Sequence, residues 1–579
     1  MRARSPLSSS SSIEASPPCA LMRICSSGPQ RWTSRAGGAA TTRRVAAAAV
    51  VAQDAPKAAQ KLAPPDAIQA IVEKELLGHA NFLASDELGG RLTGSKGQQA
   101  AAKYIASYFE SLGLAPLGDR VEGGDAGVRS YYQRYGIERT YVVDGASVVV
   151  GEVRLDEGFA VLGAKEMTAE IAGKAAWVGY GRTRGASRDI PEDGDLSGKV
   201  AVVAVKGPRG RVRDDLSVEQ KFGMSFGVLG GLGRTARNLA KVGAEAVLFV
   251  QWEDKVGLAD VLNYVALSPG KAMVTPNFPG ADRSMSMMGR MVRSGGVPTL
   301  VLSTGASRRV LAQLGVDEDA FRAFVEDGDA APTGEGGVDC SVGIAVKHEE
   351  DASASNVCAV LRGSDPDLRA EAIVYSAHMD HVGKRMDGDV FNGADDNASG
   401  SAGLLAIASA YAKADRPPRR SVIFLSVSGE ELGLWGSQYY SDHSTWQLDK
   451  LVANINTDMI GRSGPESGPM QVTVTPSYRH PKFSTIVRDS AAFAESMGVT
   501  FSSGDKYYAR SDHYNFAKKG IPVVFFCNGE HEDYHQVTDH AEKLDGAKME
   551  RIARLAFWTG WHVANADERP KGLGRQKGW

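Results

Sequence analysis

Four short runs of almost uninterrupted apolar residues mark the carboxyl-terminal part of the chain: EAIVYSA (371–377), RSVIFLSVS (420–428), LVANINT (451–457) and IPVVFF (521–526). Runs of this length without polar alternation are typical of parallel strands that are buried on both faces. Helical patterns such as ASGSAGLLAIASAYAK (398–413) lie between them. The alternation over 346–569 predicts an α/β fold, with a doubly wound and mainly parallel sheet.

A helical pattern precedes this region near the amino terminus. The segment GQQAAAKYIASYFESLGL (97–114) places Ala101, Ile105, Phe109 and Leu112 on one stripe, and Gly113 ends the pattern. We therefore expect residues 66–113 to be mainly helical and to pack on the same core.

Residues 155–345 have a different sequence pattern, with short β-like runs between Gly and Pro turns. DLSGKVAVVAV (195–205) reads as a turn followed by a strand, and RTARNLAKVGAEAVLFV (234–250) as a helix followed by a strand. This pairing resembles the protease-associated domain, a small β-rich module that is inserted in some exopeptidases. No ionisable cluster here suggests chemistry, so we expect a role in substrate access or partner contact.

The composition restricts the class of protein. With 579 residues the chain is too long for a single core, and 43% hydrophobic with 23% charged residues is ordinary for a soluble globular protein. No apolar run is long enough to span a bilayer. The net charge of −3 and the lack of a Lys/Arg block argue against nucleic acid as a partner.

The first 55 residues form a leader. The run VAAAAVVA (45–52) follows Arg43 and Arg44 and precedes the polar QDAP, which is the order of a signal peptide with cleavage near Ala52. The Ser/Arg-rich stretch before it also fits an organellar transit peptide, so import into an organelle is the alternative to export. Beyond the leader, Cys340, Cys358 and Cys527 remain, and Cys340–Cys358 is the only plausible disulfide.

Acidic and imidazole side chains follow the predicted strands. In parallel sheets ligands bind beyond the carboxyl ends of the strands, so these side chains should gather at one edge. Such crowding of anions is repulsive unless cations neutralise it, and His with several carboxylates suits a two-metal hydrolytic site. The candidates are His378, Asp380 and His381 of HMDH, Asp395 and Asp396 of GADDNASG, Glu430 and Glu431 of GEE, Asp458 of NTDMIG, and His535 of EDYHQVTD.

Five segments then carry a resemblance to a known family: SAHMDH, NGADDNASGSAG, SGEELGLWGS, NTDMIG and SDHYNFAKKGIPVVFF. They are similar to the signatures of the di-zinc exopeptidases that include bacterial secreted aminopeptidases, glutamate carboxypeptidases and the transferrin-receptor ectodomain. The similarity is close over 346–569 and looser over SDELGGRLTGS (85–95). After the leader (1–55), we therefore expect a first part of the peptidase domain (56–154), an inserted protease-associated-like domain (155–345) and the catalytic zinc domain (346–579).

The resemblance also implies a role for each residue. Two zinc ions per chain would activate water, Glu430 would be the general base, Asp380 would orient a ligand and Tyr508 would lie near the reaction intermediate. Asp396 would shape the turn beside Asp395. The implied metal ligands are His378 and Asp458 on one ion, Glu431 and His535 on the other, and Asp395 between the two.

The polarity of the reaction depends on which end of a peptide the site can hold. A carboxylate-rich site suits the α-ammonium of a peptide, which favours an aminopeptidase acting on peptides with a free N-terminus. A carboxypeptidase needs a cation for the substrate's carboxylate, for which Lys506 and Arg510 are the candidates. A non-catalytic receptor-like ectodomain is the third alternative, and the complete ligand set argues against it.

Overall fold

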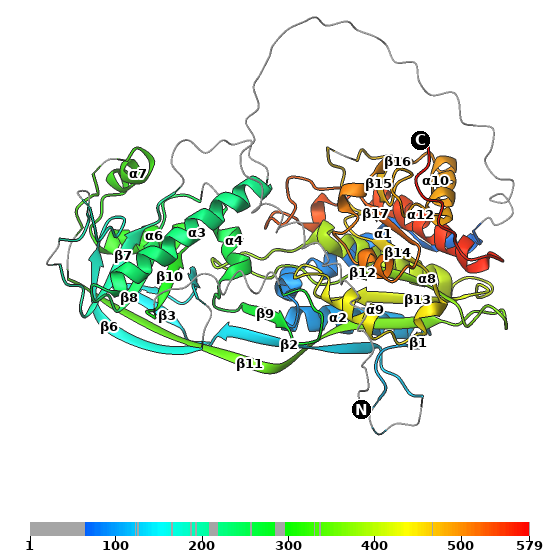
Figure 1. The fold of residues 1–579 in the computed structure, drawn as a ribbon, viewed down its shortest axis with the longest axis horizontal. Coiled ribbons are helices and arrows are strands. Elements are labelled where there is room, and N and C mark those ends of the chain that lie inside the picture. The colour runs from blue at the N-terminus through cyan, green and yellow to red at the C-terminus, as the bar shows by residue number, and fades with distance from the viewer. Residues whose placement is uncertain are drawn as a thin grey trace, which may run out of the picture.

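A computed structural model describes residues 64–577, except for 122, 124–126, 164–165, 186–187, 192–193, 208–217, 255–256, 284–295, 329, 335–336 and 466. The described chain forms two lobes that share two long strands (Figure 1). The leader and its expected cleavage site lie outside the described residues. No helix among the described residues is both long and apolar enough to cross a membrane.

One lobe contains the predicted α/β sheet. Its centre is parallel, in the order β13, β12, β14, β17, and antiparallel strands flank it: β11 beside β13, and β15 with its parallel neighbour β16 beside β17. The predicted doubly wound, mainly parallel sheet is confirmed here. The strands are β11 (Val338–Leu361), β12 (Ala372–His378), β13 (Ser421–Val427), β14 (Leu451–Thr457), β15 (Gln471–Thr475), β16 (Thr500–Ser503) and β17 (Val523–Cys527), and a short β1 (Ala115–Pro116) pairs with β11.

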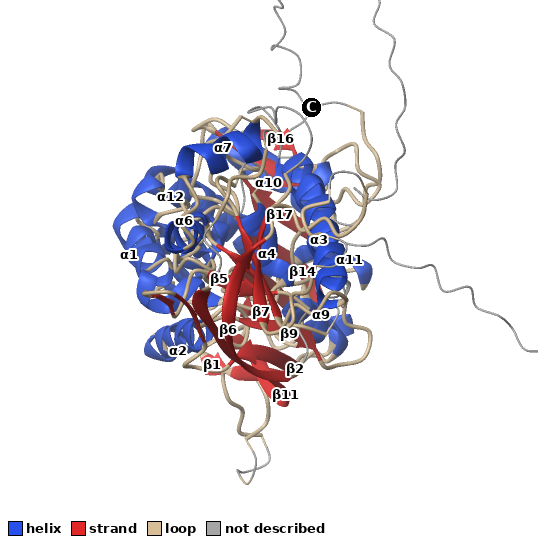
Figure 2. Ribbon diagram, turned by 90° about the vertical axis from the view of Figure 1, so that its left-hand side faces the viewer, coloured by secondary structure: helices blue, strands red, loops and turns tan. Residues whose placement is uncertain are grey.

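Helices cover both faces of this sheet, as Figure 2 shows. Ile373 and Tyr375 of β12 point to one face, and Val374 points to the other, which explains why the whole strand is apolar. The helices on the first face are α1 (Glu73–Leu83), α2 (Lys96–Ser111), α8 (Gly400–Ala412), α10 (Thr485–Ser496) and α12 (Gly546–Asn565), and those on the second are α9 (Trp435–Asp442) and α11 (His513–Lys518).

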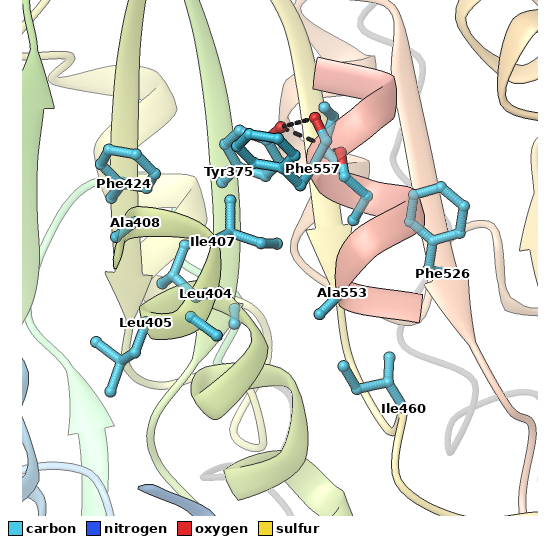
Figure 3. Close-up of a cluster of buried hydrophobic side chains, with 14 of the residues drawn as sticks. Tyr375, Leu404, Leu405, Ile407, Ala408, Phe424, Ile460, Phe526, Ala553 and Phe557 are labelled. Atoms are coloured by element: carbon cyan, nitrogen blue, oxygen red, sulfur yellow. Dashed lines mark hydrogen bonds between the residues drawn. The ribbon is translucent and has the colours of Figure 1, made fainter. Parts of the chain in front are cut away.

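Tyr375 lies at the centre of the larger core, between β13 and α12 (Figure 3). Its ring stacks on Phe424 with centroids 6.0 Å apart, and its hydroxyl donates to the carbonyl oxygens of Ala556 and Phe557 at 3.1 and 3.2 Å. A buried phenol hydroxyl needs such a partner. These bonds fix the distance between β12 and α12. They therefore help to place the end of β12, where the candidate site lies.

The second lobe holds a smaller sheet between two apolar cores. The predicted strand within 195–205 is β7, and the predicted helix and strand within 234–250 are the end of α3 and all of β8. The elements are β3 (Ser147–Val150), β4 (Val153–Leu155), β5 (Phe159–Val161), β6 (Met167–Trp177), β7 (Lys199–Ala204), α3 (Val218–Ala240), β8 (Ala246–Val250), α4 (Leu258–Val265), β9 (Ala272–Pro276), β10 (Thr299–Leu302), α6 (Thr304–Gln313) and α7 (Glu318–Glu326).

The long strands β11 and β2 (Tyr132–Val142) join the lobes (Figure 1). The first half of β11 pairs with β6 and β3 of the second lobe, and its last residues pair with β13. The expected boundary after residue 345 therefore falls inside a continuous strand. The polar stretch KHEEDASAS (347–355) lies within this strand and pairs with β2 through a bulge between Glu349 and Ala352.

The expected disulfide is not formed. Cys340, Cys358 and Cys527 are buried free thiols, and Cys340 and Cys358 lie on the same strand, β11. An extended strand rises about 3.3 Å per residue, so two cysteines near its opposite ends are much too far apart to be bridged.

Candidate metal centre

The carboxyl edge of the parallel sheet gathers the predicted side chains. His378 ends β12, Glu430 and Glu431 follow β13, and Asp458 follows β14. His535 comes from the loop after β17. The turn Ala394–Ser399, directly before α8, brings two further carboxylates.

His378 faces three carboxylates and is fully buried. Its Nε2 lies 3.3 Å from Oδ1 of Asp396, 3.3 Å from Oδ1 of Asp458 and 3.9 Å from Oε2 of Glu430. On its other nitrogen, Nδ1 is 3.8 Å from Oδ1 of Asp380.

His535 is the second imidazole of the site. Its Nε2 lies 3.0 Å from Oδ2 of Asp396 and 3.0 Å from Oε2 of Glu431. The backbone of His535 is in the left-handed region with φ 55, which is uncommon for a residue with a side chain. The ring stacks on Tyr534 with centroids 4.0 Å apart.

Asp396, and not Asp395, lies between the two histidines. Its two carboxylate oxygens face one imidazole each. Asp395 points the other way: its Oδ1 accepts from the backbone N of Gly461 at 2.6 Å, and its Oδ2 lies 3.2 Å from His531 Nε2. The prediction that Asp395 bridges was wrong by one residue, because the backbone turns sharply ahead of α8 and sends neighbouring side chains in opposite directions.

Several buried atoms of this cluster lack a hydrogen-bond partner among the described residues: Nε2 of His378, Nε2 of His535 and Oδ1 of Asp458. Buried polar atoms are normally paired, so three orphans pointing into one place indicate a missing ligand. Two groups could hold a metal ion, His378 with Asp396 and Glu431, and His378 with Glu430 and Asp458. Imidazole nitrogen and carboxylate oxygen are suitable donors for zinc, so the residues fit a metal centre.

The electrostatics agree with a cation-binding site. Burial, with the nearby Asp458 and Glu431 carboxylates adding to it, raises the pKa of Glu430 well above its usual value. Burial alone would also raise the pKa of Asp396, but the nearby imidazoles of His378 and His535, 3.3 and 3.0 Å away, hold that pKa well below the usual value. The surroundings therefore shift the pKa values of these two carboxyl groups in opposite directions.

Hydrogen bonds from neighbouring residues hold the side chains of the cluster in place. Asp380 accepts from the Thr93 hydroxyl at 2.8 Å and from the backbone N of Glu430 at 3.3 Å. His381 Nδ1 is 2.6 Å from Oε1 of Glu431. The carboxylate of Asp539 accepts from the backbone N of Asp395 and of Asp396 at 3.0 to 3.2 Å.

Tyr508 does not face the site. It packs against His480, with ring centroids 4.0 Å apart, and against His513. Its neighbour Tyr507 instead lines the cavity that opens onto the cluster. Residues that line this cavity are Asp396, Glu430, Asp458, Met459, Tyr507, Arg510, Phe525, Cys527, Gly529, Glu530 and Tyr534.

Sequence reasoning missed two further groups that shape the site. Arg91 is fully buried, and its guanidinium donates to the carbonyl oxygens of Met379, Asn392 and Gly393, so it ties together the loops that carry His378 and Asp396. Arg91 lies in the segment SDELGGRLTGS (85–95), whose looser resemblance to the family could have pointed to it. Tyr264 of α4, which contacts His535, has no local motif that could have revealed it.

Comparisons with known proteins show which proteins the chain is similar to. Residues 356–559 match the family model described as peptidase family M28. A probable leucine aminopeptidase of Trichophyton verrucosum is 30% identical over 215 residues, which cover 36% of this chain and 58% of that protein. The chain thus spans little more than half the length of this relative.

Two further relatives extend the comparison. A probable zinc metalloprotease of Pyricularia oryzae is 27% identical over 363 residues, covering 52% of this chain and 69% of that protein. Among solved structures, a zinc aminopeptidase from Bacillus subtilis aligns with a TM-score of 0.47 and 18% identity, over 84% of this chain and 94% of that one. The residues that match the model of peptidase family M28, 356–559, include His378, Asp396, Asp458 and His535.

Proposed function

We propose that this protein is a zinc-dependent aminopeptidase that removes the N-terminal residue of peptides. The observation that carries the proposal is the arrangement of two imidazoles on either side of Asp396, each with one more carboxylate, and with both Nε2 atoms buried and unpartnered. The relatives named as a leucine aminopeptidase and a zinc metalloprotease support this assignment.

The residues would hold two ions. His378 and Asp458 would bind one, His535 and Glu431 the other, and Asp396 would be shared. When bound, the ions supply a Lewis acid and make water a usable nucleophile near neutral pH. A carboxylate shared by two cations also explains why four acidic side chains can be buried together.

Glu430 is left over once these ligands are assigned. It lines the cavity, and its Oε2 lies farther from His378 Nε2 than the nearest oxygens of Asp396 and Asp458 do. We propose that Glu430 takes a proton from the attacking water and passes it to the amine that leaves. Asp380, beside Nδ1 of His378, would hold that ring in place.

We propose Tyr507, in place of Tyr508, as the tyrosine that acts beside the reacting groups. It lines the same cavity as Glu430 and Asp458, and its hydroxyl accepts from the backbone N of Glu530 at 3.3 Å. A phenol hydroxyl can donate a hydrogen bond to an oxygen of the substrate. We propose that Tyr507 steadies the carbonyl oxygen on which charge develops.

The charges around the cavity favour an aminopeptidase over a carboxypeptidase. Arg510 lines the cavity, but its guanidinium is 2.6 Å from Oε1 of Glu530, so its charge already has a partner. Lys506 lies over the ring of Tyr507 at 4.7 Å. The remaining charges at the cavity are carboxylates, which suit the α-ammonium of a substrate.

The proposal is tested with three versions of one peptide: free at both ends, acetylated at the N-terminus, and amidated at the C-terminus. Acetylation removes the ammonium charge, so we expect it to lower kcat/KM by at least ~10²-fold, roughly 3 kcal/mol of transition-state binding. Amidation should change the rate little. If amidation abolishes cleavage and acetylation is tolerated, the protein is a carboxypeptidase, and if no version is cleaved the receptor-like alternative gains.

We also propose that the chain is exported and that its second lobe is a protease-associated-like insertion. The leader carries the order of a signal peptide, and the expected pairing of a strand, helix and strand is present in the lobe as β7, α3 and β8. Sequencing of the mature N-terminus from the native host should find a start near Gln53. An intact leader would contradict export by this route.

A further inference from the structure

Helix α4 of the second lobe contacts the candidate metal centre directly. The hydroxyl of Tyr264 lies 2.8 Å from Nδ1 of His535, although the two residues are 271 positions apart in the chain. The rings are tilted by 31° with centroids 6.2 Å apart, so the contact is made through the hydroxyl and not by stacking. A lobe without metal-binding groups of its own among its described residues therefore adds a hydrogen bond to the site.

The position of Tyr264 is fixed by the docking of α4. At its start, the carboxylate of Asp254 accepts from the backbone N of Leu258 and of Ala259 at 2.6 and 2.7 Å. Leu258, Val261 and Leu262 are buried in a core of the second lobe. The helix thus behaves as a rigid part of that lobe.

The same helix is tied to the loop that follows His381. The side-chain amide of Asn263 donates to the carbonyl oxygen of Val382 at 2.9 Å. Met386, farther along this loop, packs into the core that contains α4, and its carbonyl oxygen accepts from the backbone N of Gly158 at 2.7 Å. The two lobes are therefore joined beside the site, and Tyr264 is held within hydrogen-bond distance of His535.

The two nitrogens of His535 have different tasks. Nε2 points to Asp396 and Glu431, so in the proposed centre its lone pair must be free for the metal. A neutral imidazole has one N–H, which must then lie on Nδ1 and needs an acceptor. The phenol oxygen of Tyr264 is in the place to accept it. Partners of this kind fix the tautomer and the ring orientation of metal-binding histidines.

We propose that Tyr264 is a positioning residue for His535, so that the second lobe completes the metal centre of the first. This inference rests on the proposed function, since it assumes that His535 binds a metal ion. The expected consequence of losing the hydroxyl is weaker binding of one ion, on the order of 10- to 100-fold. The other ion, on the side of His378 and Asp458, should be affected less.

The test is zinc affinity, measured without substrate by competition with a chromogenic chelator. Tyr264→Phe removes the hydroxyl and keeps the ring. Tyr180→Phe is the matched control, because the Tyr180 hydroxyl donates a hydrogen bond of 3.1 Å to the carbonyl oxygen of Phe324, wholly within the second lobe. We expect Tyr264→Phe to bind one zinc more weakly and Tyr180→Phe to bind as the unmodified protein does.

A merely structural role would give a different result. Tyr264→Phe would then lower the melting temperature of the metal-free protein without changing zinc affinity, and this outcome would overturn the proposal. A raised KM at saturating zinc with unchanged zinc affinity would also overturn it, because Tyr264 would then act on the substrate. Unmodified protein that binds no zinc would refute the proposed function itself, which distinguishes that failure from the failure of this inference.

Discussion

Neighbouring residues in this site differ more in their surroundings than in their chemistry. Glu431 lies between two imidazoles, 3.0 Å from Nε2 of His535 and 2.6 Å from Nδ1 of His381. Glu430 has its backbone N bonded to Asp380 and its carboxylate at the cavity. In the proposed centre, the same functional group would thus bind a metal at one position and move a proton at the next.

The first prediction separates these two glutamates. Glu430→Gln keeps the shape of the side chain but cannot accept a proton, so kcat should fall by on the order of 10² to 10⁴ while both metal ions stay bound. Glu431→Gln is the control and should lose metal. Metal analysis and steady-state kinetics on both variants decide the matter, and metal loss from Glu430→Gln with metal retained in Glu431→Gln would reverse the assignments.

A second prediction concerns the adjacent aspartates. Asp396→Asn removes a charge that faces both imidazoles, so the variant should fail to hold two ions and should be inactive. Asp395→Asn changes a carboxylate that bonds to Gly461 and faces His531, so two ions should still bind, although less tightly. Zinc titration of both variants measures this. Normal binding by Asp396→Asn would return the bridging position to Asp395.

Sequence could place the segments of the site but not every residue within them. Each motif follows a strand, and strand ends of a parallel sheet meet at one edge, so the convergence of His378, Asp458 and His535 was predictable. The choice between Asp395 and Asp396, or between Tyr507 and Tyr508, depends on how the backbone turns within a loop. No periodicity describes such a turn, and both of these choices were wrong.

At the scale of elements, close packing of β12 against α12 determines where the strand ends lie. Gly560 of α12 faces Tyr375, and a Cβ at this position would lie 1.8 Å from the Tyr375 hydroxyl oxygen. The glycine is therefore needed for the approach of helix and strand, although glycine inside a helix costs about 1 kcal/mol relative to alanine.

The third prediction follows from this contact. Gly560→Ala should lower the free energy of unfolding by about 1 to 3 kcal/mol, because the methyl group displaces Tyr375 from its two hydrogen bonds. Gly78→Ala in α1 is the matched control, since a Cβ there meets no atom within 4 Å. It should raise the free energy of unfolding by up to about 1 kcal/mol. Chemical denaturation measures both, and equal effects would contradict the packing argument.

The elements that escaped prediction share a physical cause. Buried parallel strands such as β12 are apolar throughout and stand out in the sequence, whereas β11 alternates buried and exposed residues and then exposes a run of polar ones. The strand that pairs with β11, β2, lies about 200 positions earlier in the chain, and only the fold brings the two together. The same separation explains why the contact of Tyr264 with His535 could not be foreseen.

At the scale of the whole molecule, the metal centre is a region of concentrated negative charge inside a nearly neutral protein. Elements from the whole lobe that contains the α/β sheet bring together four acidic side chains: Asp396, Glu430, Glu431 and Asp458. Tyr264 of the second lobe contacts His535 beside them. The stability of both lobes should therefore depend on the cations. Ligands that bind only the folded state stabilise it by mass action, by roughly 2.7 kcal/mol at a concentration 100 times Kd.

The last prediction is that removal of metal weakens the entire fold and abolishes activity together. Treatment with a chelator should lower the melting temperature and stop peptide cleavage, and titration with zinc should restore both, with saturation at about two ions per chain. Calorimetry and activity followed through the same titration provide the measurement. Asp396→Asn, which should fail to hold two ions, should gain less in melting temperature from zinc than the unmodified protein does. Full activity with a single bound ion would contradict the two-metal centre. A melting temperature that the chelator leaves unchanged would show that the buried carboxylates are neutralised in some other way.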